Sequence, residues 1–193
     1  MEARGPMGSL KELITGNLIH SRSIDMKSYA LDEDTVLVEG WLRDDRFEKI
    51  YNTTGEEMDK GPVHYLTIRL KVGGSPPAIL DAEAEMPHVP LEFCRTVLDS
   101  IPKVIGMNIQ AGFVKKVRAL MGGVKGCSHL THLLTVMSQA ALHGYITNKW
   151  RKKRPVANSI DDVENIEFLV GSCRAWTQDG PKLEALKAAI ARR

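Results

Sequence analysis

The chain has 193 residues, a formal net charge of +2 and 26% charged residues. This length allows one domain with a hydrophobic core and a short appendage, and the balanced charge gives no argument for nucleic-acid binding. Three cysteines at irregular spacing indicate free thiols rather than a disulfide framework. Residues 1–14 lack the apolar core of a signal peptide, and no uncharged run is apolar enough to span a bilayer. We therefore expect a cytoplasmic protein without a membrane segment.

Taken in chain order, residues 1–16 are rich in glycine and charge and are expected to form a flexible N-terminal arm. Four segments with alternating apolar residues then predict strands. The polar stretch Asp44–Gly61 between the second and third is expected to be an exposed loop. Because turns join the strands, the sequence predicts an antiparallel β-meander with one apolar face. The four strand segments are Leu18–Met26, Thr35–Arg43, Val63–Val72 and Ala78–Glu85.

Three helical segments are expected to cover that apolar face. The first begins near Pro90, with Phe93, Cys94, Val97 and Leu98 directed inward, and ends at Ile101-Pro102. The second includes Phe113–Leu120 and is ended by Gly122-Gly123. The third spans Ser128–Asn148 and carries no Asp, Glu, Lys or Arg, so we expect it to be buried on both faces or to pack against a second subunit in a homodimer.

These elements predict an α+β fold, with a four-stranded antiparallel meander covered on one face by about three helices. The core domain is expected over residues 17–148, and residues 149–193 are expected to form a basic linker and a C-terminal extension that packs on the core. The basic run Lys149–Arg154 follows the third helix, where cations are favoured by the helix dipole. The run is short and no nucleic-acid-binding fold accompanies it, which argues against nucleic-acid recognition.

The third helix is preceded by the segment Gly122–His129, which contains Cys127 and His129. The two side chains converge only if Cys127 lies before the first helical turn, and the glycines favour that arrangement. A cysteine there is either a packed core residue or a thiol whose anionic form is favoured by the helix N-terminus. Cys127 and His129, with Cys173 and also Cys94, offer ligands suited to zinc or iron. Cys94 lies on an inward helical stripe and fits the core better than a metal site.

Several segments together resemble a bacterial family known only as domain of unknown function 2889. They include the pattern GGxxGCxHLxxLL at Gly122–Leu134, HxxTIRL at His64–Leu70 and DAEA at Asp81–Ala84. The segment Cys173–Pro181 resembles a family Cys-His-Ala segment, with Arg174 in place of the histidine. The resemblance implies a bacterial soluble protein and no established activity, and it favours a site that combines Cys127, His129 and Cys173.

His20 and His64 lie in phase with apolar neighbours on two predicted strands, so we expect them to be structural histidines, buried and hydrogen-bonded within the sheet. Two functions remain open from the sequence. One is a Cys/His site, either metal-binding or based on a reactive thiol, at the N-terminus of the 128–148 helix. The other is a non-catalytic binding or assembly module that acts through the neutral face of that helix. Whether the protein is an enzyme stays open.

Overall fold

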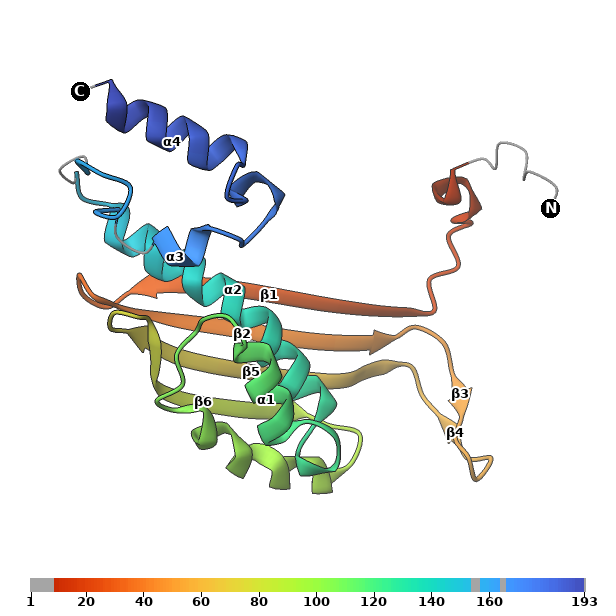
Figure 1. The fold of residues 1–193 in the computed structure, drawn as a ribbon. Helices are drawn as coiled ribbons and strands as arrows, with labels where there is room; N and C mark the ends of the chain where they lie inside the picture. The colour runs from red at the N-terminus through yellow and green to blue at the C-terminus, as the bar shows by residue number, and fades with distance from the viewer. Residues whose placement is uncertain (1–8, 154–156, 164–165, 193) are drawn as a thin grey trace.

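The computed structural model describes residues 9–153, 157–163 and 166–192. Its centre is a four-stranded antiparallel sheet in the order β1-β2-β5-β6 (Figure 1), which confirms the predicted meander and the α+β class. Residues 1–8 of the expected arm and Arg154-Pro155 lie outside the described residues. The bounds of the four strands are β1 His20–Ala30, β2 Thr35–Arg46, β5 Gly61–Gly73 and β6 Ala78–His88.

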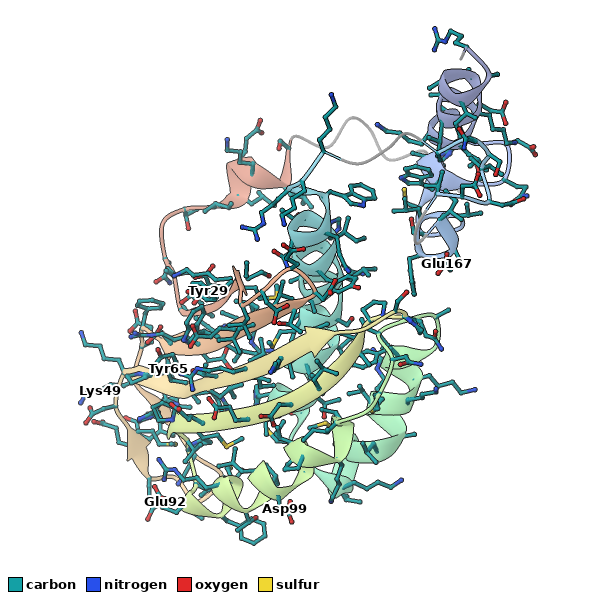
Figure 2. All side chains as sticks on the ribbon, turned by 90° about the vertical axis from the view of Figure 1, so that its left-hand side faces the viewer. Tyr29, Lys49, Tyr65, Glu92, Asp99 and Glu167 are labelled. Carbon is teal, nitrogen blue, oxygen red and sulfur yellow. The ribbon has the colours of Figure 1, made fainter. Side chains whose placement is uncertain are left out.

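Helices cover one face of this sheet, because alternate residues of each strand direct apolar side chains to that side. Helix α2 (Ser128–Trp150) lies along the sheet and packs against β1, β2 and β5. The 3-10 helix η2 (Glu92–Val104) packs on β6, and α1 (Phe113–Met121) packs on α2. Figure 2 shows side chains filling the space between the sheet and these helices. The core of buried apolar residues runs from Val36 to Tyr145.

Two glycines set the position of α2. A Cβ atom on Gly126 would lie 2.5 Å from the carbonyl oxygen of Met121, so only glycine fits the tight connection from α1 to α2. A Cβ atom on Gly144 would lie 2.5 Å from the Cβ atom of Ser28, so α2 approaches β1 closely at this point. Together, these contacts fix where along the sheet the helix begins.

Several segments differ from the sequence expectations. Strand β2 continues three residues beyond Arg43, because β1 and β5 extend alongside it as far as Arg46. The expected Asp44–Gly61 loop contains a short hairpin of β3 (Ile50–Tyr51) and β4 (Glu57–Met58). The first covering helix has 3-10 geometry and runs past Pro102 to Val104. Phe93, expected to face inward, is 78% exposed, because it lies in the first turn of that helix, whose buried residues are all near the other end.

Residues 128–148 of α2 carry no charged side chain, and this has a structural reason. Thr131 and Ser138 are buried, and the Thr131 hydroxyl donates a hydrogen bond of 2.9 Å to the carbonyl oxygen of Met121 at the end of α1. A charged side chain at either position would lose its hydration inside the protein. Charges return at the C-terminal end, where Lys149 pairs with Asp34 and Lys152 with Glu33 in the β1–β2 turn.

The C-terminal segment contains α3 (Ile166–Leu169), the 3-10 turn η4 (Arg174–Trp176) and α4 (Pro181–Ala191). Figure 1 shows α4 farther from the sheet than α2. Residues of α3 face α1 and α2 across a cavity of about 350 Å³. A short 3-10 turn, η1 (Leu10–Leu13), precedes β1, and another, η3 (Gly123–Lys125), precedes α2. Within the described residues, no helix combines the length and apolarity that a bilayer crossing requires.

Candidate functional site

The apolar rows on the helix-covered face of the sheet end in polar residues where α2 begins. Along β2, the buried Leu42 is followed on the same face by Asp44. On β5, His64 precedes Leu66 on that face, and on β1, Arg22 precedes Ile24. The strand register places Arg22 opposite Asp44, and Asp44 opposite His64. The three polar residues are therefore side by side on neighbouring strands.

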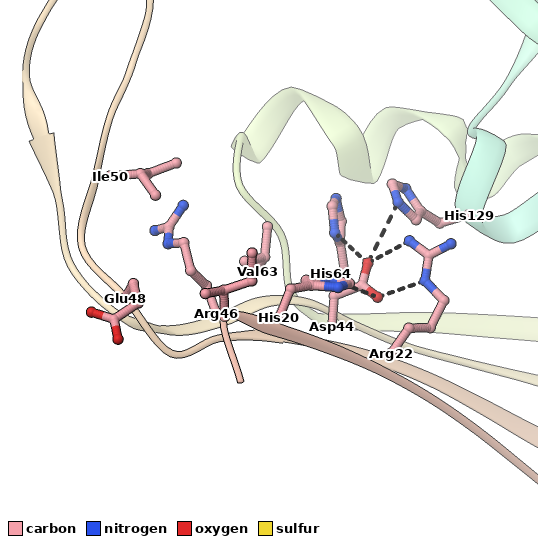
Figure 3. A pocket seen from close by; sticks show the side chains of 10 residues that line it. His20, Arg22, Asp44, Arg46, Glu48, Ile50, Val63, His64 and His129 are labelled. Carbon is pink, nitrogen blue, oxygen red and sulfur yellow. Dashed lines mark hydrogen bonds and ion pairs between the residues drawn. The ribbon is translucent and has the colours of Figure 1, made fainter. Parts of the chain in front are cut away.

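Asp44 is the centre of this group and is only 2% exposed. The Arg22 guanidinium donates two hydrogen bonds to it, from Nε to Oδ1 at 2.6 Å and from Nη2 to Oδ2 at 2.7 Å. His64 Nδ1 lies 3.0 Å from Oδ2 of the same carboxylate. His20 is farther away, with Nε2 3.8 Å from Oδ1 (Figure 3).

His129 reaches the same carboxylate from the first turn of α2. Its Nε2 atom lies 3.6 Å from Asp44 Oδ2, and its ring stacks on that of His64 with a centroid distance of 3.7 Å. The other ring nitrogen, Nδ1, lies 3.8 Å from Cys127 Sγ. Cys127 precedes the first turn of the helix, in extended backbone conformation, as the glycine-rich segment predicted. Asp44 and Cys127 therefore contact opposite nitrogens of one imidazole ring.

The surroundings set the protonation states of these groups. The Arg22 hydrogen bonds lower the pKa of Asp44 and outweigh the effect of burial, so Asp44 is a carboxylate at neutral pH. Burial lowers the pKa of His64, against the raising effect of Asp44. Burial also lowers the pKa of His129, and the neighbouring His64 and Arg22 lower it further. Both imidazoles are therefore neutral near pH 7, and one negative charge faces one arginine.

A pocket of about 580 Å³ opens beside this group, at the end of the sheet that carries the β3–β4 hairpin (Figure 3). One part of its wall is polar and is formed by His20, Arg22, Asp44, His64 and His129. The apolar part comes from Ile19, Ile50 and Val63, while Arg46 and Glu48 lie toward the hairpin. Small-molecule sites in proteins commonly have volumes of about 300–1,000 Å³, so the pocket is large enough for a small ligand.

The comparison with family models places most of the chain in one family. The model described as "Protein of unknown function (DUF2889)" matches residues 20–143, well over half of the chain. The protein belongs to the DUF2889 family. No match was found among curated proteins or among solved structures. The segment matched by the DUF2889 model begins at His20 and includes Arg22, Asp44, His64 and His129, so it contains the whole polar group.

The structure places the remaining expected site residues as follows. Cys94 is partly buried against the hydrophobic core. Cys173 is exposed, precedes the η4 turn and lies beyond the segment matched by the DUF2889 model. The part of the chain that the structure describes shows no interaction of Cys94 or Cys173 with Cys127. The cysteines proposed from the sequence as a ligand set are thus not brought together in this structure.

The two strand histidines differ from each other. His64 is largely buried and bonded to Asp44, as expected for an inward-facing residue. The His20 side chain is 52% exposed, contrary to the expectation that its ring is buried. The physical reason is its position at the start of an edge strand, before the point where α2 begins to cover β1. Both rings line the same pocket.

Asp44 and Arg22 were not singled out by sequence reasoning, although both carried a signal. The alternation Val36, Val38, Gly40, Leu42 continues in phase to Asp44, so this carboxylate falls on the core face. A charged residue on a core face needs a partner, and Arg22 meets that need from the neighbouring strand.

Proposed function

We propose that this DUF2889 protein holds a divalent transition-metal ion, zinc or iron(II), with Asp44, His64 and His129 as the protein ligands. The observation that carries the proposal is the convergence of one carboxylate oxygen and two imidazole nitrogens, all within 4.8 Å of one another. Two histidines and one carboxylate form a common ligand set for both metals. The proposal keeps His129 from the sequence hypothesis and replaces the cysteines by Asp44 and His64.

The separations between the ligand atoms support this assignment. Neighbouring ligands about 2.0–2.1 Å from a zinc ion lie about 2.8–3.4 Å from each other in octahedral or tetrahedral arrangements. Asp44 Oδ2 is 3.0 Å from His64 Nδ1 and 3.6 Å from His129 Nε2. The two imidazole nitrogens lie within 4.8 Å of each other, so a metal ion bridging the three atoms requires the histidine side chains to draw together. The protonation states also fit, because metal ligands are neutral imidazoles and ionised carboxylates.

Neighbouring groups act on these ligands as supporting residues. Carboxylates and imidazoles that bind metals usually make a second hydrogen bond that fixes their orientation. Arg22 fixes the Asp44 carboxylate and uses one lone pair of each oxygen, which leaves a second lone pair on Oδ2. Cys127 contacts the nitrogen of His129 that faces away from Asp44. In this arrangement, the thiol is a neighbour of a ligand and not itself a ligand.

A titration of the purified full-length protein with Co²⁺, followed by visible absorption, tests the proposal. We expect Asp44→Asn, His64→Ala and His129→Ala to weaken cobalt binding by more than about tenfold, since each removes a ligand. His132→Ala is the matched control, because His132 is an exposed histidine on the same helix. Far-UV circular dichroism checks that each variant is folded. Equal cobalt affinity in the wild type and all four variants would refute the assignment.

A second candidate function is acid–base chemistry without a metal, and the Arg22–Asp44 pair favours it. Arg22 already cancels the charge of Asp44, and a proton on His64 Nδ1 directed to Asp44 would leave Nε2 as a neutral base. Nitrogen NMR of His64 separates the two functions. The metal proposal predicts that Zn²⁺ displaces the proton from Nδ1 and shifts its resonance, whereas an Nδ1 resonance unchanged by Zn²⁺ would favour the acid–base function.

The assembly-module alternative draws less support from the structure. Its surface was to be the neutral face of α2, and Thr131 and Ser138 of that face are buried within the chain itself. The exposed residues of α2 are Ser128, His132, Gln139, His143, Thr147 and Trp150, and the last two lie at its C-terminal end. We further propose a cytoplasmic location, on the ground that Cys94, Cys127 and Cys173 are all free thiols.

A further inference from the structure

The pocket beside Asp44 has two chemically different parts. Its inner end is formed by the polar group, and its outer wall carries Ile19, Ile50 and Val63. Ile19, which directly precedes β1, is 60% exposed, and Ile50 of the β3–β4 hairpin is 41% exposed. Covering such side chains with an apolar group is favourable, at roughly 25 cal/mol per Å². The outer wall therefore suits a ligand with an apolar body.

The charge at the inner end indicates the other part of the ligand. Asp44 contributes −1 and Arg22 contributes +1, and an imidazole bound to a metal ion is neutral. A divalent ion bound there would leave the group with a net charge of +2 in a largely desolvated position. Three protein ligands also leave coordination positions open for another ligand. Arg46 and Glu48 near the hairpin carry opposite charges and offset each other. An anionic head group on the metal would thus complete both the coordination and the charge.

We infer that the pocket binds a small carboxylic acid with an apolar body, the carboxylate directed to the metal and the body lying against Ile19, Ile50 and Val63. This inference rests on the proposed metal site and names the class of ligand that the same site accepts. His20, at the edge of the polar group with Nε2 3.8 Å from Asp44 Oδ1, lies where it can donate a hydrogen bond to the incoming carboxylate. An alcohol with the same carbon chain lacks the negative charge of the carboxylate, and acetate lacks the apolar chain.

The test uses the full-length protein with labelled isoleucine methyl groups, with and without Co²⁺. Hexanoate, hexan-1-ol and acetate are added as probes, and binding is followed by the cobalt absorption bands and by methyl NMR of Ile19 and Ile50. We expect hexanoate to shift both signals and to bind the cobalt-loaded protein about tenfold or more tightly than hexan-1-ol does. Acetate should change the cobalt bands at higher concentration and leave the methyl signals unchanged.

Two variants examine the apolar wall. Ile50→Ser should weaken hexanoate binding by about threefold or more, because an apolar contact is lost, and it should leave acetate binding unchanged. Leu80→Ser is the matched control, since Leu80 is an apolar strand residue of similar exposure, 45%, that does not line the pocket. Equal effects of the two substitutions would contradict the assignment of the wall.

The outcomes separate the inference from the proposed function. Cobalt binding with no preference for hexanoate over hexan-1-ol would overturn the inference and leave the metal site intact. Absence of cobalt binding, with hexanoate still shifting the Ile19 and Ile50 methyl signals, would overturn the metal site and the placement of the carboxylate on it, and would leave only the apolar wall supported. If cobalt does not bind and hexanoate does not shift the methyl signals, both the metal site and the inferred ligand class are overturned.

Discussion

At the scale of single residues, Asp44 connects all parts of the site. Its carboxylate is bonded to Arg22 through both oxygens and lies within 3.8 Å of His20, His64 and His129. Because Asp44 is almost fully buried, solvent and salt screen these interactions only weakly. Substituting it would leave the Arg22 guanidinium without its counter-charge at the inner end of the pocket. The carboxylate thus supports the local structure as well as the proposed metal.

The position of Cys127 gives a prediction that distinguishes the two ligand sets. If Asp44, His64 and His129 hold the metal, Cys127→Ser should change cobalt affinity by less than about tenfold, because serine can still contact His129 Nδ1. The absorption spectrum should also lack the intense band of a cobalt–thiolate bond. A loss of affinity in Cys127→Ser as large as in His129→Ala would restore the cysteine as a ligand.

Individual residues of the site differ in how far the sequence predicts them. His64 and Asp44 fall on the core face by simple alternation, so their inward direction can be deduced from the pattern. The contact between Asp44 and His129 cannot, because it depends on where α2 begins along the sheet. That position is set by the backbone approach at Gly126 and by the packing of α2 on β1. The periodicity of apolar residues within one helix or strand carries no information about the approach at Gly126 or about the packing of α2 on β1.

At the scale of elements, the contact between α2 and β1 is unusually close. Gly144 lies within a helix, where alanine is normally more stable by about 1 kcal/mol. Here, a Cβ atom would meet Ser28 Oγ at 2.3 Å and Ser28 Cβ at 2.5 Å. The side-chain oxygen can rotate away, whereas the Cβ atom can move only with the backbone of β1. The packing cost therefore outweighs the gain in helix propensity.

We expect Gly144→Ala to lower the free energy of unfolding by about 1–3 kcal/mol, measured by urea denaturation. Combining it with Ser28→Gly should restore part of the loss, because the substituted glycine has no Cβ atom to collide with. Ser28→Gly alone provides the reference for the cost of glycine in a strand. A stabilised Gly144→Ala protein would show that α2 and β1 are farther apart than described.

The elements themselves followed from sequence patterns to different degrees. The strands, α1 and α2 have strong alternation or helical spacing, and the structure confirms them close to their predicted bounds. The end of β2 was missed because a polar residue after Arg43 looks like a loop when its partner strand is not considered. The 3-10 geometry of η2 was missed because the inward spacing of Cys94, Val97 and Leu98 fits both helix types.

At the scale of the whole molecule, the buried apolar residues are concentrated in one part of the chain. The core cluster extends from Val36 to Tyr145. Among the described residues after Tyr145, only Leu183 is a buried hydrophobic residue. This distribution supports the proposed division into a core domain of residues 17–148 and a C-terminal extension of residues 149–193. The homodimer expected from the neutral helix stays a prediction, which light scattering can check.

The division predicts the result of a truncation. A chain that ends at Lys152 keeps the Lys149–Asp34 and Lys152–Glu33 pairs and all of the core cluster. We expect its melting temperature to differ from that of the full chain by less than about 4 °C, since about 1 kcal/mol corresponds to that shift in a domain of this size. Scanning calorimetry provides the measurement. A non-cooperative transition in the shorter chain would show that the extension is part of the folding unit.

The site joins three adjacent strands to the start of one helix, and this has a consequence for how the protein would acquire the proposed metal ion. Arg22, Asp44 and His64 come together as soon as the meander forms, whereas His129 arrives only when α2 docks on the sheet. A chain with a formed sheet and an undocked helix has an incomplete site and would bind the proposed metal ion weakly. By thermodynamic linkage, a ligand that contacts both elements favours the docked state, by about 2.7 kcal/mol at a concentration of 100 times its dissociation constant. Occupancy of the site and closure of the helix on the sheet are then one equilibrium.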